Sequence, residues 1–218
     1  MKLWLQSCGD LGVNPMWNEY EASLKRHFRK VARPDTEVSL HGTNVFSGRT
    51  RLYQYDVYLH TSELIEKAIS AEQQGYDAYV QVGMQDYGYF EVKEVVGIPV
   101  IFPVENALRV ASMFAPKIAF LTYSSVMLER LNDKARKIAQ QGANIMITAG
   151  NPITMLLIDN GRTELAGVRV LDSQGTLVKM AEFMVDLHKM GINRNSMGEY
   201  APQPRDILAM TRKLYGVG

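Results

Sequence analysis

The sequence predicts an α/β protein built on a parallel β-sheet with helices on both of its faces. Two short apolar segments, Ala78–Val82 and Ile145–Ala149, are typical of buried strands that end at a loop. Strand-like and helix-like segments alternate between them, which is the pattern of successive βαβ units. Because each βαβ unit makes its two strands parallel and lays its helix on the sheet, both faces of the sheet are expected to be buried.

The N-terminal part predicts a strand, a helix and a second strand. Residues 3–7 form the first apolar strand, and a glycine-containing loop follows it. Asn14 and Pro15 supply a helix cap and a first-turn proline, so a helix is expected to run to about Val31. Alternation over Glu37–His41 predicts the next strand.

Residues 42–60 are polar and rich in tyrosine, without a strong period. We expect a connection here, and it is longer than most loops that lack a functional role. Thr61 or Ser62 caps the next helix, which Gly75 closes. The elements expected after it are strand 78–82, helix 91–95, strand 100–102, helix 107–114, strand 118–122, helix 127–140 and strand 145–149.

Composition and motifs narrow the class of function. Of the 218 residues, 46% are hydrophobic and 22% are charged, as in ordinary globular proteins. The 24 basic and 23 acidic side chains nearly cancel, which argues against nucleic acid or an anionic membrane as partner. One cysteine allows no internal disulfide, and the sequence has no dinucleotide, P-loop or metal-ligand motif. The early polar residues and the lack of a long apolar run predict a cytoplasmic protein.

Two segments carry a resemblance to a known family. The first reads Asp77-Ala78-Tyr79-Val80-Gln81-Val82-Gly83, continues through Met84-Gln85-Asp86-Tyr87-Gly88 and Gly97-Ile98-Pro99-Val100, and reaches Glu105; the second runs from Gly142 to Gly150. This order resembles the aspartate/glutamate/hydantoin racemase superfamily, in its hydantoin-racemase-like branch. The family pattern is roughly Asp-Ala-hydrophobic-Cys-x-x-Asp-x-Gly, then Ile-Pro-Val and Glu-Ala. The tail from Gly191 to Pro204 is also similar, so the resemblance covers nearly the whole chain.

The resemblance implies two pseudo-symmetric parallel-sheet lobes with the pocket in the cleft between them. Lobe one would comprise residues 1–100 plus 192–218, and lobe two residues 101–191. Glutamine–glycine helix ends recur before both buried strands, at Gln74-Gly75 and Gln141-Gly142, which fits two related halves. Relatives usually hold an extra strand and helix where this chain has the single expected helix 127–141, so the second lobe is expected to be trimmed.

Family enzymes place one thiol at each of two strand ends, on opposite faces of the substrate carbon. The matching positions here are Gly83 and Gly150. Because glycine carries neither acid nor base, racemisation by two thiols is not expected. The arylmalonate decarboxylases of the same superfamily have glycine at the first position and cysteine at the second, and this chain lacks that second thiol as well. What is expected to persist is a cradle of backbone groups that binds an anion.

The expected binding residues follow the carboxyl ends of strands, where ligands of open α/β sheets bind. Glycine at such an end lets a ligand approach the main chain, although ordinary tight turns would look the same. Glu105 has the further interpretation of a first-turn glutamate favoured by the helix dipole. The predicted substrate-binding residues are Ser7, Asp10, Gly83, Met84, Glu105, Thr122, Tyr123, Ser124, Gly150 and Asn151.

Four side chains are candidates for proton transfer: Asp86, Tyr55, His60 and Cys8. Asp86 matches the family aspartate, but it is equally placed to cap a helix that begins at Tyr87. Cys8 ends the first strand, where a thiol could replace a missing base or be an inert buried group.

Other aromatic and histidine side chains have simpler interpretations. Tyr53 and Tyr58, which flank Tyr55, are interpreted as subunit contacts. His27 and His188 lie on charged helix faces and are expected to be solvated.

The resemblance implies a cofactor-independent enzyme that acts on a small carboxylate or cyclic amide. Without the two thiols we expect lyase, decarboxylase, isomerase or hydrolytic chemistry. Two alternatives stay open: a non-catalytic relative that binds a small acid, and a hydantoin or amino-acid racemase with a base pair that is not two cysteines. Relatives commonly assemble, so a homo-oligomer is expected.

Overall fold

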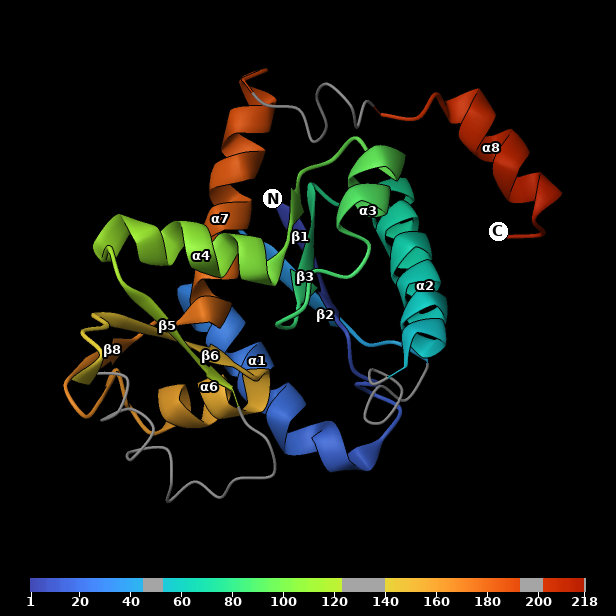
Figure 1. Cartoon of the computed structure of the whole chain (residues 1–218). Coiled ribbons are helices and arrows are strands. Elements are labelled where there is room, and N and C mark those ends of the chain that lie inside the picture. Colours follow the sequence, from blue (N-terminus) through green and yellow to red (C-terminus); the bar gives the residue numbers. More distant parts are fainter. Residues whose placement is uncertain (45–52, 123–139, 193–201, 218) are drawn as a thin grey trace.

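Two four-stranded sheets form the frame of the computed structural model, which describes residues 1–44, 53–122, 140–192 and 202–217 (Figure 1). Sheet A has the order β2 (Glu37–His41), β1 (Lys2–Ser7), β3 (Ala78–Val82) and β4 (Val100–Ile101), with every pair parallel. Sheet B has the order β5 (Ile118–Thr122), β6 (Ile145–Ala149), β8 (Val168–Val170) and β7 (Glu164–Leu165), with β7 antiparallel to β8. The predicted α/β class and the predicted parallel strands are confirmed.

The helices of the first half are α1 (Asn18–Val31), α2 (Gln54–Gln73) and α3 (Tyr89–Val95), with a short 3-10 turn at Pro15–Trp17 before α1. Asn14 accepts a hydrogen bond from the Met16 N–H at 3.1 Å, so the predicted cap is present. The later helices are α4 (Pro103–Phe114), α6 (Asn151–Asp159), α7 (Ser173–Lys189) and α8 (Arg205–Leu214).

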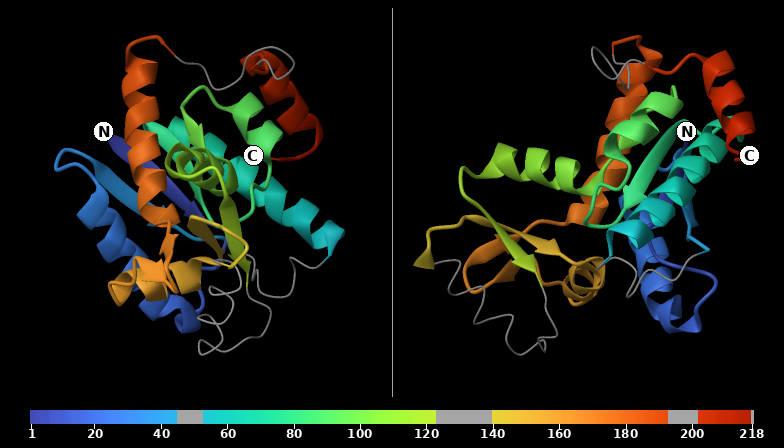
Figure 2. Two further views of the ribbon diagram at one scale, coloured as in Figure 1. Left: turned by 60° about the vertical axis from the view of Figure 1, so that its left-hand side comes forward. Right: turned by 45° about the vertical axis from the view of Figure 1, so that its right-hand side comes forward.

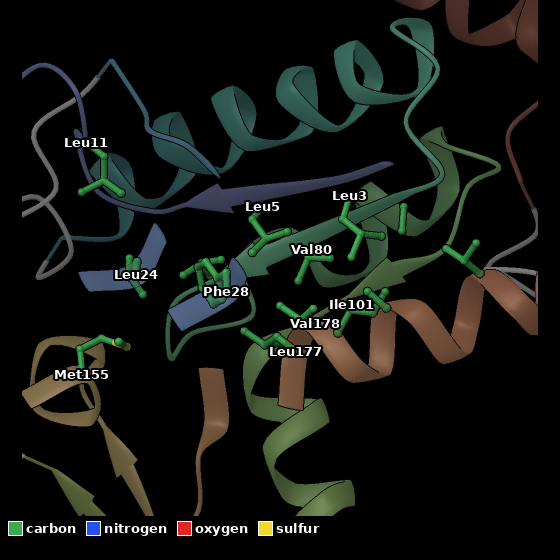
Figure 3. Packing of buried hydrophobic residues seen from close by; sticks show 14 residues of the cluster. Leu3, Leu5, Leu11, Leu24, Phe28, Val80, Ile101, Met155, Leu177 and Val178 are labelled. Atoms are coloured by element: carbon green, nitrogen blue, oxygen red, sulfur yellow. The ribbon is translucent and has the colours of Figure 1, made fainter. Parts of the chain in front are cut away.

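Sheet A is buried on both faces because its strand residues alternate between two cores. Leu3 and Leu5 of β1 face α1 and α7, whereas Trp4 between them faces α2 and α3. Figure 3 shows the first of these cores, with Phe28 of α1 and Leu177 of α7 packed on the same side of the sheet. The two central strands are therefore almost continuously buried, as expected for a parallel sheet covered on both sides.

Sheet B is also covered on both faces, by α6 on one side and α4 on the other. Met146 packs with Leu157 of α6, while its neighbours Ile145 and Ile147 pack with Ala107 and Ala111 of α4. Figure 1 and the right-hand view of Figure 2 show this sheet to one side of sheet A. The chain thus forms two sheet-centred lobes.

Helix α7 follows sheet B in the chain and returns to sheet A. Its buried residues Leu177, Val178 and Ala181 belong to the core of sheet A, which also receives Met155 from α6 (Figure 3). The division at residues 100/101 and 191/192 stays a prediction. Helix α7 (Ser173–Lys189) belongs to the predicted second lobe by sequence but packs on sheet A of the first.

Two expectations about local structure were wrong. Helix α2 begins at Gln54, so residues 54–60 are helical rather than part of a connection. The reason is an inward stripe at three- and four-residue spacing, Val57, His60, Leu64 and Ala68, which exposed tyrosines obscure in the sequence. The hairpin of β7 and β8 was not expected, and it makes sheet B mixed.

His27 is not solvated as expected. It is 8% exposed, and its Nε2 lies 2.9 Å from a carboxylate oxygen of Asp172, which accepts a hydrogen bond from the Gly175 N–H and so caps α7. The expected helix 127–140 lies almost wholly outside the described residues. Within the described ranges, no helix is both long and apolar enough to traverse a lipid bilayer.

Candidate active site

A cavity of about 260 Å³ lies where the carboxyl ends of β1, β3 and β6 meet, between the two lobes. It receives residues from sheet A, from sheet B and from the beginning of α1. Its lining consists of Ser7, Cys8, Gly9, Leu11, Trp17, Tyr20, Val82, Gly83, Met84, Gln85, Ala149, Gly150, Asn151 and Pro152. Six of the predicted site residues are among them: Ser7, Cys8, Gly83, Met84, Gly150 and Asn151.

Gly150 and the first turn of α6 form the side of the cavity that belongs to the second lobe. Gly150 caps α6, and its carbonyl accepts hydrogen bonds from the N–H groups of Ile153 at 3.0 Å and Thr154 at 3.1 Å. The N-terminal end of α6 therefore lies at the cavity, where the partial positive charge of a helix terminus favours an anion.

Asn151 joins the two glycine turns directly. In the amide orientation that satisfies both of its polar atoms, its oxygen accepts a hydrogen bond from the Gly83 N–H at 3.1 Å. Its NH₂ group donates to the Gly83 carbonyl at 3.0 Å. The strand ends of β3 and β6 are thus held against each other across the lobe boundary, with the main chain of Gly83 engaged at both of its polar groups.

Cys8 lies beside Gly83 on the first lobe. It is 3% exposed, and its backbone N–H donates to the Val82 carbonyl at 3.2 Å. Its Sγ lies 3.3 Å from the point that a Cβ atom on residue 83 would occupy. The Cys8 thiol therefore fills space that a side chain at position 83 would need.

Trp17 and Tyr20 supply an aromatic side to the cavity that the sequence did not predict. The two rings pack edge to face with their centroids 6.0 Å apart. The Trp17 indole N–H donates to an Asp10 carboxylate oxygen at 2.7 Å, so Asp10 holds this ring and is itself absent from the lining. Their place at the start of the helix that follows β1, on the carboxyl side of sheet A, was the available signal.

Asp86 lies outside the lining and caps a helix, although not the helix expected. Its two carboxylate oxygens accept hydrogen bonds from the N–H groups of Val104 at 2.8 Å and Glu105 at 3.0 Å, at the N-terminus of α4. Burial raises the pKa of Asp86, and these two hydrogen bonds only partly oppose that shift.

Glu105 is likewise engaged away from the cavity. Its carboxylate forms ion pairs with Lys93 at 3.1 Å and with Arg109 at 2.8 Å. Burial opposes its ionisation, but Lys93, Tyr89 and Arg109 together outweigh burial and lower the pKa of Glu105. Glu105, Lys93 and Arg109 thus form an ion-pair cluster that links α3 and α4.

The remaining predicted residues lie in several places. Tyr55 is 71% exposed in the first turn of α2. His60 is 3% exposed and packs edge to face against Tyr87, whose ring belongs to the same buried cluster as Cys8. Thr122 ends β5, and Tyr123 and Ser124 lie outside the described residues. Among the described side chains, no group of three His, Cys, Asp or Glu residues could hold a metal ion.

A sequence model of the family described as Asp/Glu/Hydantoin racemase matches residues 11–139, which is more than half of this chain. The chain belongs to this racemase family. A hydantoin racemase from Pseudomonas sp. strain NS671 is 29% identical over 150 residues, which cover 67% of this chain and 57% of that protein. The matched region thus spans little more than half the length of that relative.

Solved structures of racemase-family proteins have the same fold. Allantoin racemases from Klebsiella pneumoniae and Pseudomonas fluorescens are each 17% identical, with a TM-score of 0.69 over 94% of this chain and 94% and 98% of theirs. A double mutant of arylmalonate decarboxylase in its liganded form is 10% identical, with a TM-score of 0.54 over 84% of this chain and 92% of that one. At these identities the likeness establishes the fold, and the reaction has to be argued from the site.

Proposed function

We propose that this racemase-family protein is a cofactor-independent enzyme that moves a proton at one face of a small carboxylate or cyclic amide. Lyase or decarboxylase chemistry fits this cavity better than racemisation by two thiols. The observation that carries the proposal is the Cys8 thiol, which lies at the junction of two strand ends that both terminate in glycine.

The ionisable groups of the cavity support chemistry at one face. Cys8 and Tyr20 are the ionisable side chains that line it within the described residues. Racemisation by two thiols needs one thiol on each face of the carbon, and the two family positions are occupied by Gly83 and Gly150. One thiol beside an anion-binding turn is sufficient for a reaction that protonates a carbanion once.

The backbone on the second-lobe side can stabilise the negative charge. A substrate carboxylate or a developing enolate oxygen would lie at the N-terminus of α6, next to Gly150. Pre-oriented N–H groups in a partly enclosed cavity stabilise such charge without reorganising during the reaction.

For a decarboxylation the proposed step is as follows. The bond between the α-carbon and the leaving carboxylate breaks, carbon dioxide departs, and the electron pair stays on the α-carbon as an enolate. Cys8 then gives its S–H proton to that carbon, and the resulting thiolate regains a proton from water. Electrons and protons balance without an external oxidant or reductant.

Deuterium incorporation tests the proposal. The protein is incubated in D₂O with aspartate, glutamate, allantoin, 5-substituted hydantoins and an arylmalonate, and the products are followed by NMR and chiral chromatography. We expect one substrate class to give a product that carries one deuterium at a single configuration. Cys8→Ala should reduce this turnover at least about a hundredfold, whereas Ser112→Ala on the exposed side of α4 should not change it. Full turnover by Cys8→Ala would refute the role of the thiol, and binding without exchange for every compound would refute the enzyme.

Racemisation by a pair other than two cysteines is the second candidate, because Tyr20 lines the same cavity as Cys8. In that case deuterium would enter both enantiomers of one substrate. Tyr20→Phe would abolish the exchange for the enantiomer from which Tyr20 removes the proton. One-handed product that persists in Tyr20→Phe would exclude this candidate.

A further inference from the structure

Two buried amides lie at the cavity, Asn151 in its lining and Gln174 next to Asn151, and the proposed proton transfer does not use them. Asn151 is 7% exposed, and Gln174, the second residue of α7, is fully buried at 0%. The amide groups of the two residues lie 3.0 Å apart. The N-termini of α6 and α7 therefore meet through these side chains, and Asn151 in turn contacts Gly83.

Both polar atoms of the Asn151 amide have partners in this arrangement. Its oxygen accepts from the Gly83 N–H, and one hydrogen of its NH₂ group is donated to the Gly83 carbonyl. The other hydrogen faces the Gln174 amide nitrogen at 3.0 Å. Because an amide nitrogen does not accept, the Gln174 amide must also turn so that its oxygen faces this hydrogen. Gln174 thus fixes the rotation of the Asn151 side chain, and Asn151 fixes the peptide groups of Gly83.

The amide of Gln174 acts through its neighbour Asn151. The two amide groups lie 3.0 Å apart, so an apolar side chain of similar size at position 174 would leave Asn151 without this partner. Gln174 can therefore influence the cavity through the orientation of Asn151.

We infer that Asn151 and Gln174 are positioning residues that clamp the β3 and β6 ends of the cavity together. Because Gly83, Met84 and Gln85 line the cavity, the clamp sets the distance between the Cys8 side and the α6 side. This inference rests on the proposed function for its catalytic consequence, whereas the clamp itself is a statement about geometry.

Alkylation of Cys8, the single cysteine of the chain, can test the clamp without any substrate. Iodoacetamide reacts with Cys8 at a rate that depends on how often the cavity opens. Asn151→Asp keeps the acceptor for the Gly83 N–H but replaces the donor with an oxygen that faces the Gly83 carbonyl. Gln174→Met keeps the volume and removes the amide. Gln73→Met is the matched control, because Gln73 is an exposed residue at the end of α2.

We expect Asn151→Asp and Gln174→Met each to raise the alkylation rate of the native protein about tenfold, which corresponds to one lost hydrogen bond of about 1.4 kcal/mol. The double variant should show less than the product of the two effects, because both changes release the same clamp. Melting temperatures and urea midpoints are measured for every variant. Unchanged alkylation, or a rate that rises only as much as global unfolding does, would overturn the inference, and Gln174→Met decides it alone if Asn151→Asp does not fold.

Measurements of turnover test the clamp and the proposed function independently of each other. With a substrate from the D₂O experiment, Gln174→Met should lower kcat about tenfold while KM changes less than about threefold. This is expected when the groups of the cavity are no longer held in the arrangement that the transition state needs. An unchanged kcat in a variant with faster alkylation would overturn the positioning role. If the wild-type protein turns over no compound but the variants are alkylated faster, the clamp stands and the proposed function fails.

Discussion

The Cys8 side chain lies close to the position that a side chain on residue 83 would occupy. The sulfur atom lies 3.3 Å from the position of a Cβ on residue 83, which is closer than most side-chain carbons tolerate. A side chain at the end of β3 would therefore have to displace the thiol at the end of β1 by a few tenths of an ångström. In this chain the sulfur atom at the site belongs to Cys8, which follows β1, whereas the residue that follows β3 is glycine.

This exclusion predicts a compensating pair of substitutions. Gly83→Ala alone should destabilise the protein by about 1–3 kcal/mol through overpacking. The same substitution in a Cys8→Ala background should cost far less, because the neighbouring sulfur has been removed. Urea denaturation of the four proteins completes the cycle, and costs for Gly83→Ala that are equal in the two backgrounds would contradict the overlap.

Asp86 illustrates how a family-like aspartate can be a cap. Asp86→Ala should cost about 0.5–2 kcal/mol because two N–H groups of α4 lose their acceptor, and Asp86→Asn should cost less. Turnover should be nearly unchanged in Asp86→Asn. A large loss of kcat without a loss of stability would instead make Asp86 the base.

The raised pKa of Asp86 determines how its contribution to the free energy of unfolding changes with pH. Because burial raises its pKa in the folded state, the native protein holds the proton over a pH range in which the unfolded chain has released it. The contribution of Asp86 to stability therefore falls as the pH rises from its ordinary pKa to the raised one. Asp86→Asn should remove this part of the slope.

At the scale of elements, Glu182 holds the end of α1 against α7. Its side chain is 1% exposed, accepts a hydrogen bond from the Arg33 N–H at 2.7 Å and pairs with Lys179 at 3.0 Å. Burial opposes its ionisation, but the Arg33 N–H, Lys179 and Thr36 together outweigh burial and lower the pKa of Glu182. The stabilising contribution is present above the ordinary glutamate pKa and is lost as the pH falls through the lowered value.

Replacing this carboxylate should flatten the acid side of the stability curve. Glu182→Gln should cost about 1–3 kcal/mol at neutral pH, since a charged hydrogen-bond acceptor is lost. Its loss of stability between neutral pH and the acid limb should then be smaller than that of the wild type. Glu164→Gln, at an exposed position in β7, is the control and should follow the wild-type curve; a Glu182→Gln curve that also parallels the wild type would contradict the assignment.

The predictable elements were those whose pattern is local. The strands at 37–41, 78–82, 118–122 and 145–149 carry short apolar or alternating segments, and the structure places them within those bounds. The start of α2 was missed because tyrosine dominates its exposed side, while its inward positions include His60. Tertiary packing, not local sequence, makes that histidine a core residue.

Strand ends located the site, but the identity of its neighbours required three dimensions. The rule that ligands bind beyond carboxyl strand ends selected Ser7, Cys8, Gly83 and Gly150, which the cavity brings together. No local pattern connects Asn151 with Gly83 or with Gln174, because these contacts join segments that are distant in the chain.

At the scale of the whole molecule, the two lobes are interlocked rather than simply linked. Helix α7 follows sheet B, yet Leu177 and Val178 complete the core of sheet A, and Met155 of α6 joins them. Asp172 at the start of α7 contacts His27 of α1 at 2.9 Å. Loss of packing in either lobe should therefore be felt in the other.

This interlocking predicts one cooperative unfolding transition for both lobes. Leu177 is fully buried, so Leu177→Ala should cost about 2–5 kcal/mol. Both tryptophans of the chain, Trp4 and Trp17, report on the first lobe, whereas hydrogen exchange in β5 and β6 reports on sheet B. In urea the two probes should have the same midpoint in the wild type and should shift together in Leu177→Ala.

Leu157→Ala provides the reciprocal test, because Leu157 packs in the core of sheet B alone. If the lobes unfold as one unit, this change in the second lobe must also lower the midpoint that the tryptophans of the first lobe report. A tryptophan midpoint that stays at the wild-type value, while β5 and β6 exchange at lower urea, would mean that the second lobe opens independently. The cavity, which needs both lobes, would then be present only in the fully closed state, and substrate binding would have to stabilise the second lobe selectively.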